Sequence, residues 1–140
     1  MAIKFTQDGN LSDIVVNKAK EKINKKLNEV YAEVIPLTPV SKSVRATSGR
    51  QGHTGGRLKR GWAIIPAEDV NGVVTGYLYN NVHYAAHVNY GHRTRLGMGL
   101  KYTNLYKPDG TKKKRYVEGR HFLEKALTKC GIESNKRWEK

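Results

Sequence analysis

Apolar residues recur every three or four positions through the N-terminal part of the chain. The stripe runs through Leu11, Val15, Ala19, Ile23, Leu27, Val30 and Val34. This spacing predicts one amphipathic helix of about 24 residues, and Ser12 can cap its start. Pro36 and Pro39 are expected to end the helix because proline lacks an amide donor and restricts the residue before it.

A β-hairpin is predicted over residues 62–81, where apolar and aromatic residues flank Asn71-Gly72. This dipeptide suits a two-residue type I′ turn. An uninterrupted register about the turn places two sets of side chains on opposite faces. One face carries Trp62, Ile64, Tyr77 and Tyr79, and the other carries Ile65, Val74 and Leu78. Pro66 cannot donate a ladder hydrogen bond, which indicates an edge strand or a bulge there.

The segments on either side of this hairpin are less regular. Residues 41–56 are rich in Ser, Gly, Thr and Arg without periodicity, which predicts a flexible loop. Residues 82–91 predict a short helix that Gly91 ends in the left-handed conformation. Tyr84, Ala85 and Val88 are expected on the buried side of that helix.

Residues 97–118 are predicted to form an arm that reaches out of the body. Pro108-Asp109-Gly110 lies between tyrosine-rich segments and suggests a second hairpin, which would place Lys107 opposite Lys112. Like charges that face each other destabilise a sheet, so we expect this hairpin to lie outside the core.

A closing helix completes the predicted fold. Phe122, Ala126 and Cys130 form one stripe beside Leu123 and Leu127, and Gly131 is a stop signal. At 140 residues the chain is expected to form one domain, residues 1–140. We predict an α+β fold: a small antiparallel β-sheet centred on residues 61–80, packed against the long N-terminal helix and the C-terminal helix, with the extended loop and the hairpin arm attached.

Charge is the first indication of function. The chain has 26 Lys and Arg against 12 acidic residues, a formal net charge of +14. Such a surplus must face solvent, polyanions or acidic partners. The single cysteine excludes an intrachain disulfide, and no apolar run suits a membrane span or a signal peptide. The expected setting is the cytoplasm, or a particle assembled there, without membrane contact.

The basic residues are concentrated in three short runs, interleaved with tyrosines in the last. Their candidate members are Arg57, Lys59, Arg60, Arg93, Arg95, Lys112, Lys113, Lys114 and Arg115. Clusters of this kind neutralise phosphates and give salt-sensitive, sequence-independent binding to DNA, and they also suit an acidic protein partner. The alternative is that these runs are solvated surface without a ligand.

Histidine chemistry is a weaker alternative. His83 and His87 are four apart, so a helix would place both on one side, as a zinc pair requires. A third ligand would have to come from His53, His92, His121 or Cys130, and no carboxylate lies close by to orient the imidazoles. A nuclease set of His87, Asn89 and His92 would fall within six residues, where such sites spread over about thirty. We therefore expect a protein that is not an enzyme, with no catalytic residue, cofactor or metal.

The order of four segments resembles the family of bacteriophage head-tail morphogenesis proteins, the neck or tail-completion proteins of long-tailed phages. The resemblance covers nearly the whole chain. It is carried by Thr38-Pro39-Val40, by Thr54 to Leu58 with Trp62, by Tyr84-Ala85 with Val88, Gly91, Arg93 and Thr94, and by Arg120 to Leu123. The chain departs from the family pattern in the extra residues 41–53, in Gly61 for serine, in Asn89 for glutamate, and in His92 between Gly91 and Arg93.

The resemblance implies a non-enzymatic ring subunit in the virion neck, between the portal or head-completion complex and the tail-terminator or tail-tube proteins, around double-stranded DNA. It also implies a structural corner formed by Trp62, Tyr84, Val88, Gly91 and Phe122. Ring contacts would be heterologous. The +14 charge should hinder association of free subunits, so we expect rings with the portal or tail present, or at higher salt. The alternatives are a stand-alone basic nucleic-acid-binding protein and, more weakly, a His-dependent nuclease.

Overall fold

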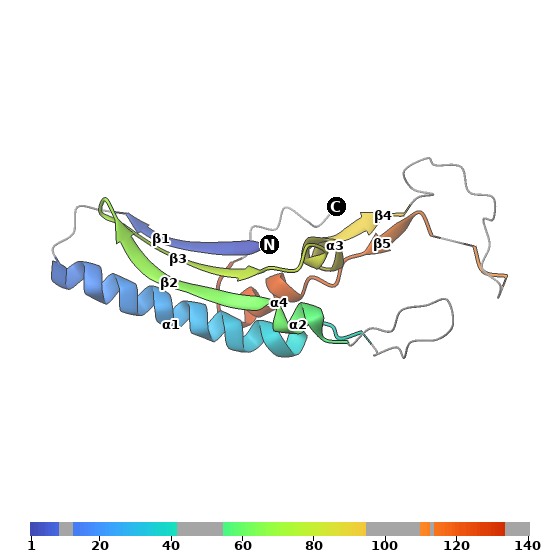
Figure 1. The fold of residues 1–140 in the computed structure, drawn as a ribbon, viewed down its shortest axis with the longest axis horizontal. Coiled ribbons are helices and arrows are strands. Elements are labelled where there is room, and N and C mark those ends of the chain that lie inside the picture. Colours follow the sequence, from blue (N-terminus) through green and yellow to red (C-terminus); the bar gives the residue numbers. More distant parts are fainter. Residues whose placement is uncertain (9–12, 42–54, 95–109, 113, 134–140) are drawn as a thin grey trace. The chain divides into compact units, whose positions relative to one another are not determined.

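The computed structural model describes residues 1–8, 13–41, 55–94, 110–112 and 114–133 (Figure 1). The chain divides into two compact units, which we describe separately. Unit 1 comprises Met1–His83 and Phe122–Lys140, and unit 2 comprises Tyr84–His121. Most of the expected loop, residues 42–54, and most of the expected arm, residues 95–109 and 113, lie outside the described residues.

Unit 1 contains the predicted small antiparallel sheet, and the α+β class is confirmed. Its strands are β1 (Ala2–Asp8), β2 (Trp62–Val70) and β3 (Val73–Asn80), in the order β1-β3-β2. The sequence interpretation did not include β1. Its signal is a short alternation in which Ile3 and Phe5 are half-buried between exposed neighbours, the period of a half-buried strand.

The predicted hairpin turn is confirmed, but the predicted faces of β2 are wrong. Asn71 and Gly72 have φ of 55° and 80°, as a type I′ turn requires. A bulge between Ile65 and Glu68 then shifts the register, so Ile64 lies opposite Leu78 and Ile65 opposite Tyr77. The extra residue at Pro66 moves every earlier side chain of β2 to the other face. The indication of an edge strand and a bulge at Pro66 is confirmed.

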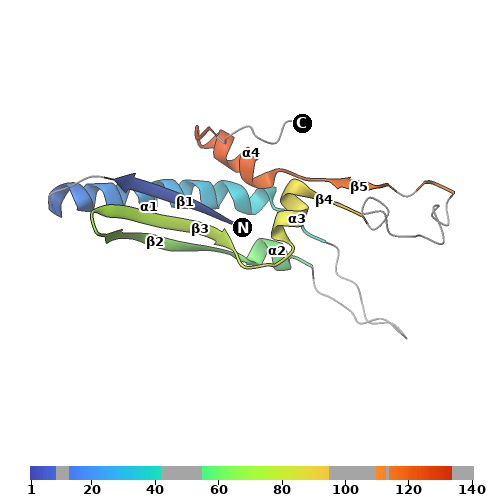
Figure 2. The same cartoon turned by 90° about the horizontal axis from the view of Figure 1, so that it is seen from above.

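Helix α1 (Asp13–Leu37) runs along one face of the sheet (Figures 1 and 2). Its buried row is Val16, Ala19, Ile23, Leu27, Val30 and Val34. Val15 was placed in this row and is exposed, because Val16 occupies the position that faces the core. Leu11 and Ser12 lie outside the described residues.

Pro36 lies inside α1, contrary to the prediction for that residue, and the helix continues one residue further to Leu37. The helix ends before Pro39, as predicted. A proline in the last turn removes only its own bond to the carbonyl of residue 32, and Ala32 is exposed, so that carbonyl can bond to water. The helix closes when the Thr38 amide donates to the Val34 carbonyl at 2.9 Å.

Two features let α1 lie close to the sheet. A Cβ added to Gly76 would come within 2.7 Å of Leu27 Cδ1 and 3.2 Å of Ile23 Cγ2, so a side chain there would have to displace Leu27. The bulge leaves the Ala67 amide without a strand partner, and Asn24 Oδ1 accepts its hydrogen bond at 2.7 Å. The helix therefore satisfies a donor that the bulge would leave unpaired.

Helix α4 (Phe122–Lys129) packs against α1, with Phe122, Leu123, Ala126 and Leu127 buried as predicted. Gly131 ends it with φ of 69°. The Gly131 amide donates to the Thr128 carbonyl and the Ile132 amide to the Leu127 carbonyl, both at 3.0 Å, which is a Schellman motif. Burial, with the carboxylates of Glu33 and Glu29, raises the pKa of the half-buried Cys130 thiol.

Unit 2 contains a short helix, α3 (Ala85–Tyr90), followed by a two-stranded antiparallel pair, β4 (Gly91–Arg93) and β5 (Tyr116–Glu118). Among the described residues, no helix is both long and apolar enough to cross a membrane.

Candidate polyanion-binding ribbon

A glycine corner converts α3 directly into β4. Gly91 has φ of 81° and ψ of 174°, so it ends the helix with a positive φ but without the predicted left-handed ψ. Such a conformation is available almost only to glycine. A Cβ at Gly91 would also overlap the Val117 carbonyl and the Gly119 amide. The corner therefore needs glycine both for its backbone angles and for the close approach of β5.

The chain returns from β5 along the end of α3. The Arg120 amide donates to the Val88 carbonyl at 3.0 Å, and the His121 amide donates to the Asn89 carbonyl at 2.9 Å. Carbonyls in the last turn of a helix have no partner within the helix, so the returning segment satisfies them. This arrangement fixes β5 relative to α3 within unit 2.

We call residues 91–94 and 114–118 the basic ribbon. Within it, His92 lies opposite Val117 and Arg93 opposite Tyr116. Thr94 extends the pairing, since its amide donates to the Arg115 carbonyl at 3.0 Å and its hydroxyl to the Lys114 carbonyl at 2.8 Å. Tyr116 and Val117 therefore pair with β4. The segment before Asp109-Gly110, which the second predicted hairpin would pair with them, lies outside the described residues.

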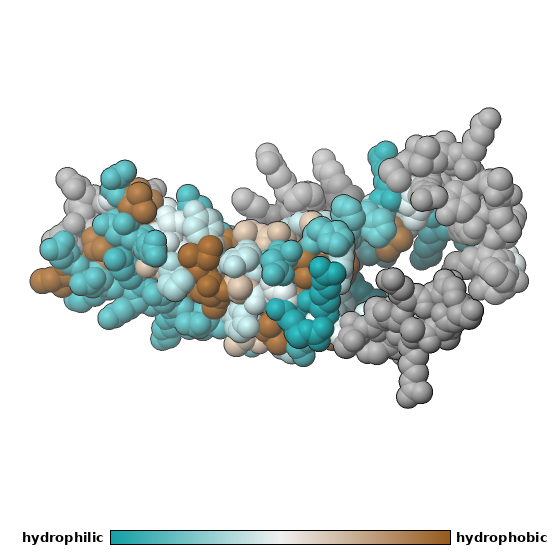
Figure 3. Space-filling view, in the orientation of Figure 1, coloured by the Kyte–Doolittle hydropathy of each residue, from teal (hydrophilic) through white to brown (hydrophobic). Residues whose placement is uncertain are grey.

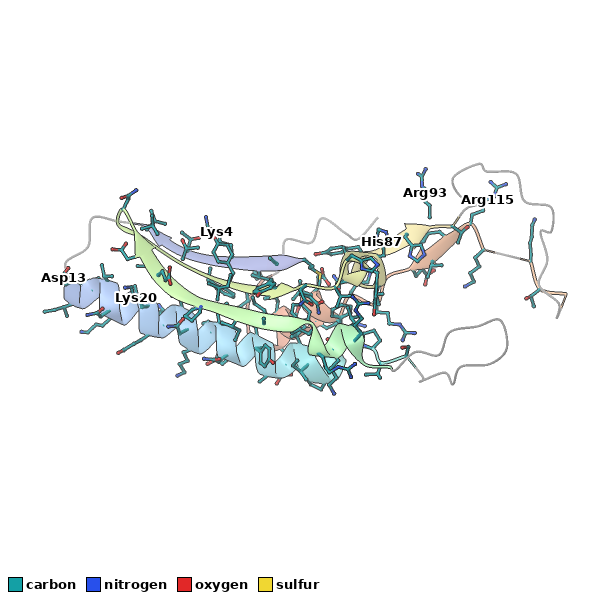
Figure 4. The ribbon with its side chains drawn as sticks, in the orientation of Figure 1. Lys4, Asp13, Lys20, His87, Arg93 and Arg115 are labelled. Carbon is teal, nitrogen blue, oxygen red and sulfur yellow. The ribbon has the colours of Figure 1, made fainter. Side chains whose placement is uncertain are left out.

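The ribbon brings together basic residues from two separate runs. Arg93, Lys114 and Arg115 are all exposed, as is Lys112 just before them. In the view of Figure 4, the side chains of Arg93 and Arg115 extend to the same side of the ribbon. Arg95 and Lys113, the other candidates in these runs, lie outside the described residues.

Unit 2 carries a disproportionate share of the charge. Over residues 84–121 the sequence has nine Lys and Arg against Asp109 and Glu118, a net +7, which is half of the total in about a quarter of the chain. Tyr116 presents an exposed ring while its hydroxyl donates to the Tyr90 carbonyl at 2.8 Å. Cations beside an exposed aromatic ring can contact phosphates and stack against bases or sugars.

The histidines do not form the sites that their spacing suggested. Helix α3 begins at Ala85, so His83 precedes it and the four-residue helical spacing to His87 is absent. The rings of His87 and His92 stack, with centroids 5.5 Å apart and both residues exposed, whereas Asn89 is fully buried. The nuclease set therefore does not converge. Within the described ranges, no group of three or more His, Cys, Asp or Glu could hold a metal ion.

The third basic run lies in unit 1, on helix α2 (Arg57–Arg60). Arg57 and Arg60 are exposed and Lys59 is half-buried. Arg60 Nη1 donates to the Gly55 carbonyl at 3.1 Å, and the buried Leu58 anchors the helix. The Leu58 carbonyl accepts a 2.8 Å hydrogen bond from Asn80 Nδ2. This cluster belongs to unit 1, whereas the basic ribbon belongs to unit 2.

The residues of the expected structural corner fall in both units. In unit 1, Trp62 and Phe122 are buried and meet edge to face, with centroids 6.1 Å apart. In unit 2, Tyr84 and Val88 are half-buried, while Ala85 and Asn89 are the fully buried residues of α3. The buried asparagine was missed because a polar side chain gives no sign of burial in the sequence.

Sequence reasoning also missed Thr94 and Tyr116 as the residues that fasten the ribbon. Threonine and tyrosine favour strands, which was the available signal. Comparisons of the chain with protein-family models, with curated proteins and with solved structures found no match.

Proposed function

We propose that this chain is a structural subunit of the neck of a long-tailed bacteriophage, a ring protein that joins the portal or head-completion complex to the tail tube and surrounds the DNA path. The observation that carries the proposal is the arrangement of the segments that resemble the neck proteins. These segments contact one another within each unit.

In unit 1, three of these segments meet in one buried cluster. Thr38 of the Thr-Pro-Val segment accepts a 2.9 Å hydrogen bond from the Trp62 indole, and Trp62 packs against Phe122 of the closing helix. Residues far apart in the chain thus depend on each other for burial. If the order of the segments is a family feature, the segments should pack against one another in the fold. The contacts of Thr38, Trp62 and Phe122 meet this expectation and support the proposal.

In unit 2, the Tyr-Ala segment and the segment leading to Arg120 hold the basic ribbon. Duplex DNA carries about one negative charge per 1.7 Å of axis, so a channel that DNA passes through favours basic walls. The net +7 of unit 2 and the exposed Arg93, Lys114 and Arg115 suit that environment. We place the ribbon at the DNA and assign it no sequence specificity.

The same ribbon favours a second candidate, a basic protein that binds nucleic acid on its own. The two are separated by the affinity of the isolated monomer for duplex DNA at physiological salt and by the presence of the chain in purified phage particles. A neck subunit should bind weakly as a monomer and copurify with particles. Tight monomer binding together with absence from particles would refute the neck proposal. Metal-dependent cleavage that is lost in His87→Ala would instead revive the nuclease.

A further inference from the structure

One end of unit 1 differs in charge from the rest of this basic chain. Residues 8–17 and 66–75 contain four carboxylates and no Lys, Arg or His. The fold brings these segments together, because Asp8 of β1 pairs with Val73 and the turn of the hairpin joins Val70 to Val73. The start of α1 lies at the same end (Figures 1 and 2), and Figure 4 shows Asp13 there.

The same end exposes large apolar side chains. Ile14 is 69% exposed, Val70 63% and Val15 40%. Figure 3 shows apolar surface at this end, surrounded by hydrophilic surface. We call Asp13, Ile14, Val15, Glu68, Asp69 and Val70 the acidic end. Apolar side chains rimmed by charge are typical of a protein contact.

The opposite end of unit 1 has the reverse charge. The described residues there, 34–41 and 55–67, contain three Lys and Arg and no carboxylate. Arg57, Lys59 and Arg60 all lie on α2. Val40 is 57% exposed. A Cβ on Gly56 would lie 3.8 Å from Val40 Cγ1, which places Val40 next to the start of α2. We call Val40, Arg57, Lys59 and Arg60 the basic end.

The two ends cannot neutralise each other within one molecule. The Trp62 indole fastens the region of α2 to Thr38, just past the C-terminal end of α1, whereas the acidic end includes its first turn. A helix of 25 residues is about 37 Å long, several times the reach of an ion pair. Within the described part of the chain, no ion pair involves Glu68, Asp69, Arg57 or Arg60.

We propose that the acidic end of one copy docks on the basic end of a second copy of this chain. The two ends are complementary. The carboxylates of the acidic end can pair with the guanidinium groups of Arg57 and Arg60, and its exposed Ile14 and Val70 can pack against Val40. Arginine and carboxylate pair strongly where the contact is partly desolvated. The contact joins different surfaces of the two copies, so repeating it closes a ring if the rotation allows. The inference rests on the proposed ring and names its contact surfaces.

The net charge of +14 opposes this contact at long range, and salt of about 0.15 M shortens that repulsion to about 8 Å. Charges in direct contact are screened less. The acidic end therefore offers the basic end of a second copy a surface of opposite charge.

Two charge-reversal variants test the contact. Glu68→Lys with Asp69→Lys makes both ends basic, and Arg57→Glu with Arg60→Glu makes both ends acidic. Sedimentation velocity and native mass spectrometry at about 0.15 M and about 0.5 M salt should show that the wild type associates more readily at the higher salt, and that each variant alone associates at least tenfold more weakly. A 1:1 mixture should regain association, with the two variants alternating, because each supplies the end that the other lacks.

Matched controls change the same net charge elsewhere. Lys22→Glu with Lys25→Glu lowers the charge by four on the exposed side of α1, and Glu21→Lys with Glu133→Lys raises it by four. Both controls should associate like the wild type and gain nothing on mixing, and circular dichroism should show all four variants folded. A mixture of the end variants that associates no better than either alone would overturn the inference while leaving a ring possible. A wild-type chain that stays monomeric at all salt and protein concentrations, and also with isolated portal or tail complexes, would overturn both the ring and this contact.

Discussion

The Trp62 indole donates a 2.9 Å hydrogen bond to Thr38 Oγ1, and both residues are buried. The same hydroxyl donates to the Val34 carbonyl at 2.7 Å. This relay fastens the first residue of β2 to the end of α1, and Phe122 packs against the indole ring. The Trp62 side chain therefore connects the start of the hairpin to both the long helix and the closing helix.

Replacing Thr38 with valine should destabilise the fold. The substitution keeps the shape but leaves the buried indole N–H without its acceptor, at a cost of about 1–3 kcal/mol in the free energy of unfolding. Urea denaturation measures this loss. Trp62→Phe should lower the free energy of unfolding by less in the Thr38→Val background than in the wild type, because the hydrogen bond to the indole is already gone. Thr6→Val, at an exposed strand position, is the control. An unchanged urea midpoint for Thr38→Val would contradict the stabilising role of the hydrogen bonds through Thr38.

Gly76→Ala should separate α1 from the sheet. The added Cβ meets Leu27 Cδ1 at 2.7 Å and the Ala67 backbone amide nitrogen at 3.2 Å, so the helix or the strand must shift. Overpacking of this kind costs about 1–3 kcal/mol, measurable as a lower thermal midpoint. Thr75→Ala on the other face of β3 should cost less than about 1 kcal/mol. Equal losses for the two variants would show that the close approach is not tight.

Gly119→Ala should loosen the base of the ribbon. A Cβ there would overlap the Asn89 carbonyl, which accepts the His121 amide. Hydrogen exchange at the amides of Arg120 and His121 should speed up by about tenfold or more, while exchange at the Thr38 amide in unit 1 should stay as it is. Unchanged protection of the Arg120 and His121 amides would mean that the segment tolerates the methyl group.

Neutralising the ribbon should weaken DNA binding in a salt-dependent way. Arg93→Gln, Lys114→Gln and Arg115→Gln together should reduce the slope of log affinity against log salt by up to about 2.7, because each lost phosphate contact is worth about 0.9. Fluorescence anisotropy with duplex DNA measures the slope. Lys18→Gln, Lys22→Gln and Lys25→Gln on α1 remove the same charge, and an equal reduction in both triple variants would show that only net charge matters.

The Cys130 thiol should react slowly with iodoacetamide. Burial raises its pKa, and the carboxylates of Glu33 and Glu29 add to the effect, so less thiolate is present at pH 8 than in a free thiol. Glu33→Gln should lower that pKa and speed alkylation, by less than about tenfold because burial remains the larger cause. Alkylation of Cys130 that is as fast as that of glutathione would contradict the burial and the raised pKa of this thiol.

The regular part of the fold could be predicted because its signals are local. The stripe from Ala19 to Val34, the Asn71-Gly72 turn and the Gly131 stop each depend on a few neighbouring residues. The faces of β2 could not, because one extra residue at Pro66 reverses them. Strand β1 was missed because five alternating residues give a weak signal beside a long helix.

The candidate site was predictable only in part. The basic runs are visible in the sequence, but the pairing of Arg93 with Tyr116 depends on the corner at Gly91 and on the return of the chain along α3. Arg57 and Arg60 fall in the other unit, which charge alone could not indicate. The burial of Asn89 and the stacking of His87 on His92 likewise follow from that corner.

Cryo-electron microscopy of phage particles assembled in cells that express this chain tests the proposed neck role most directly. We predict a closed ring of this chain between the portal and the tail tube, with Arg93, Lys114 and Arg115 of the ribbon bordering the DNA channel. Particles that lack the chain, or that carry it elsewhere than the neck with the ribbon turned away from DNA, would contradict the account.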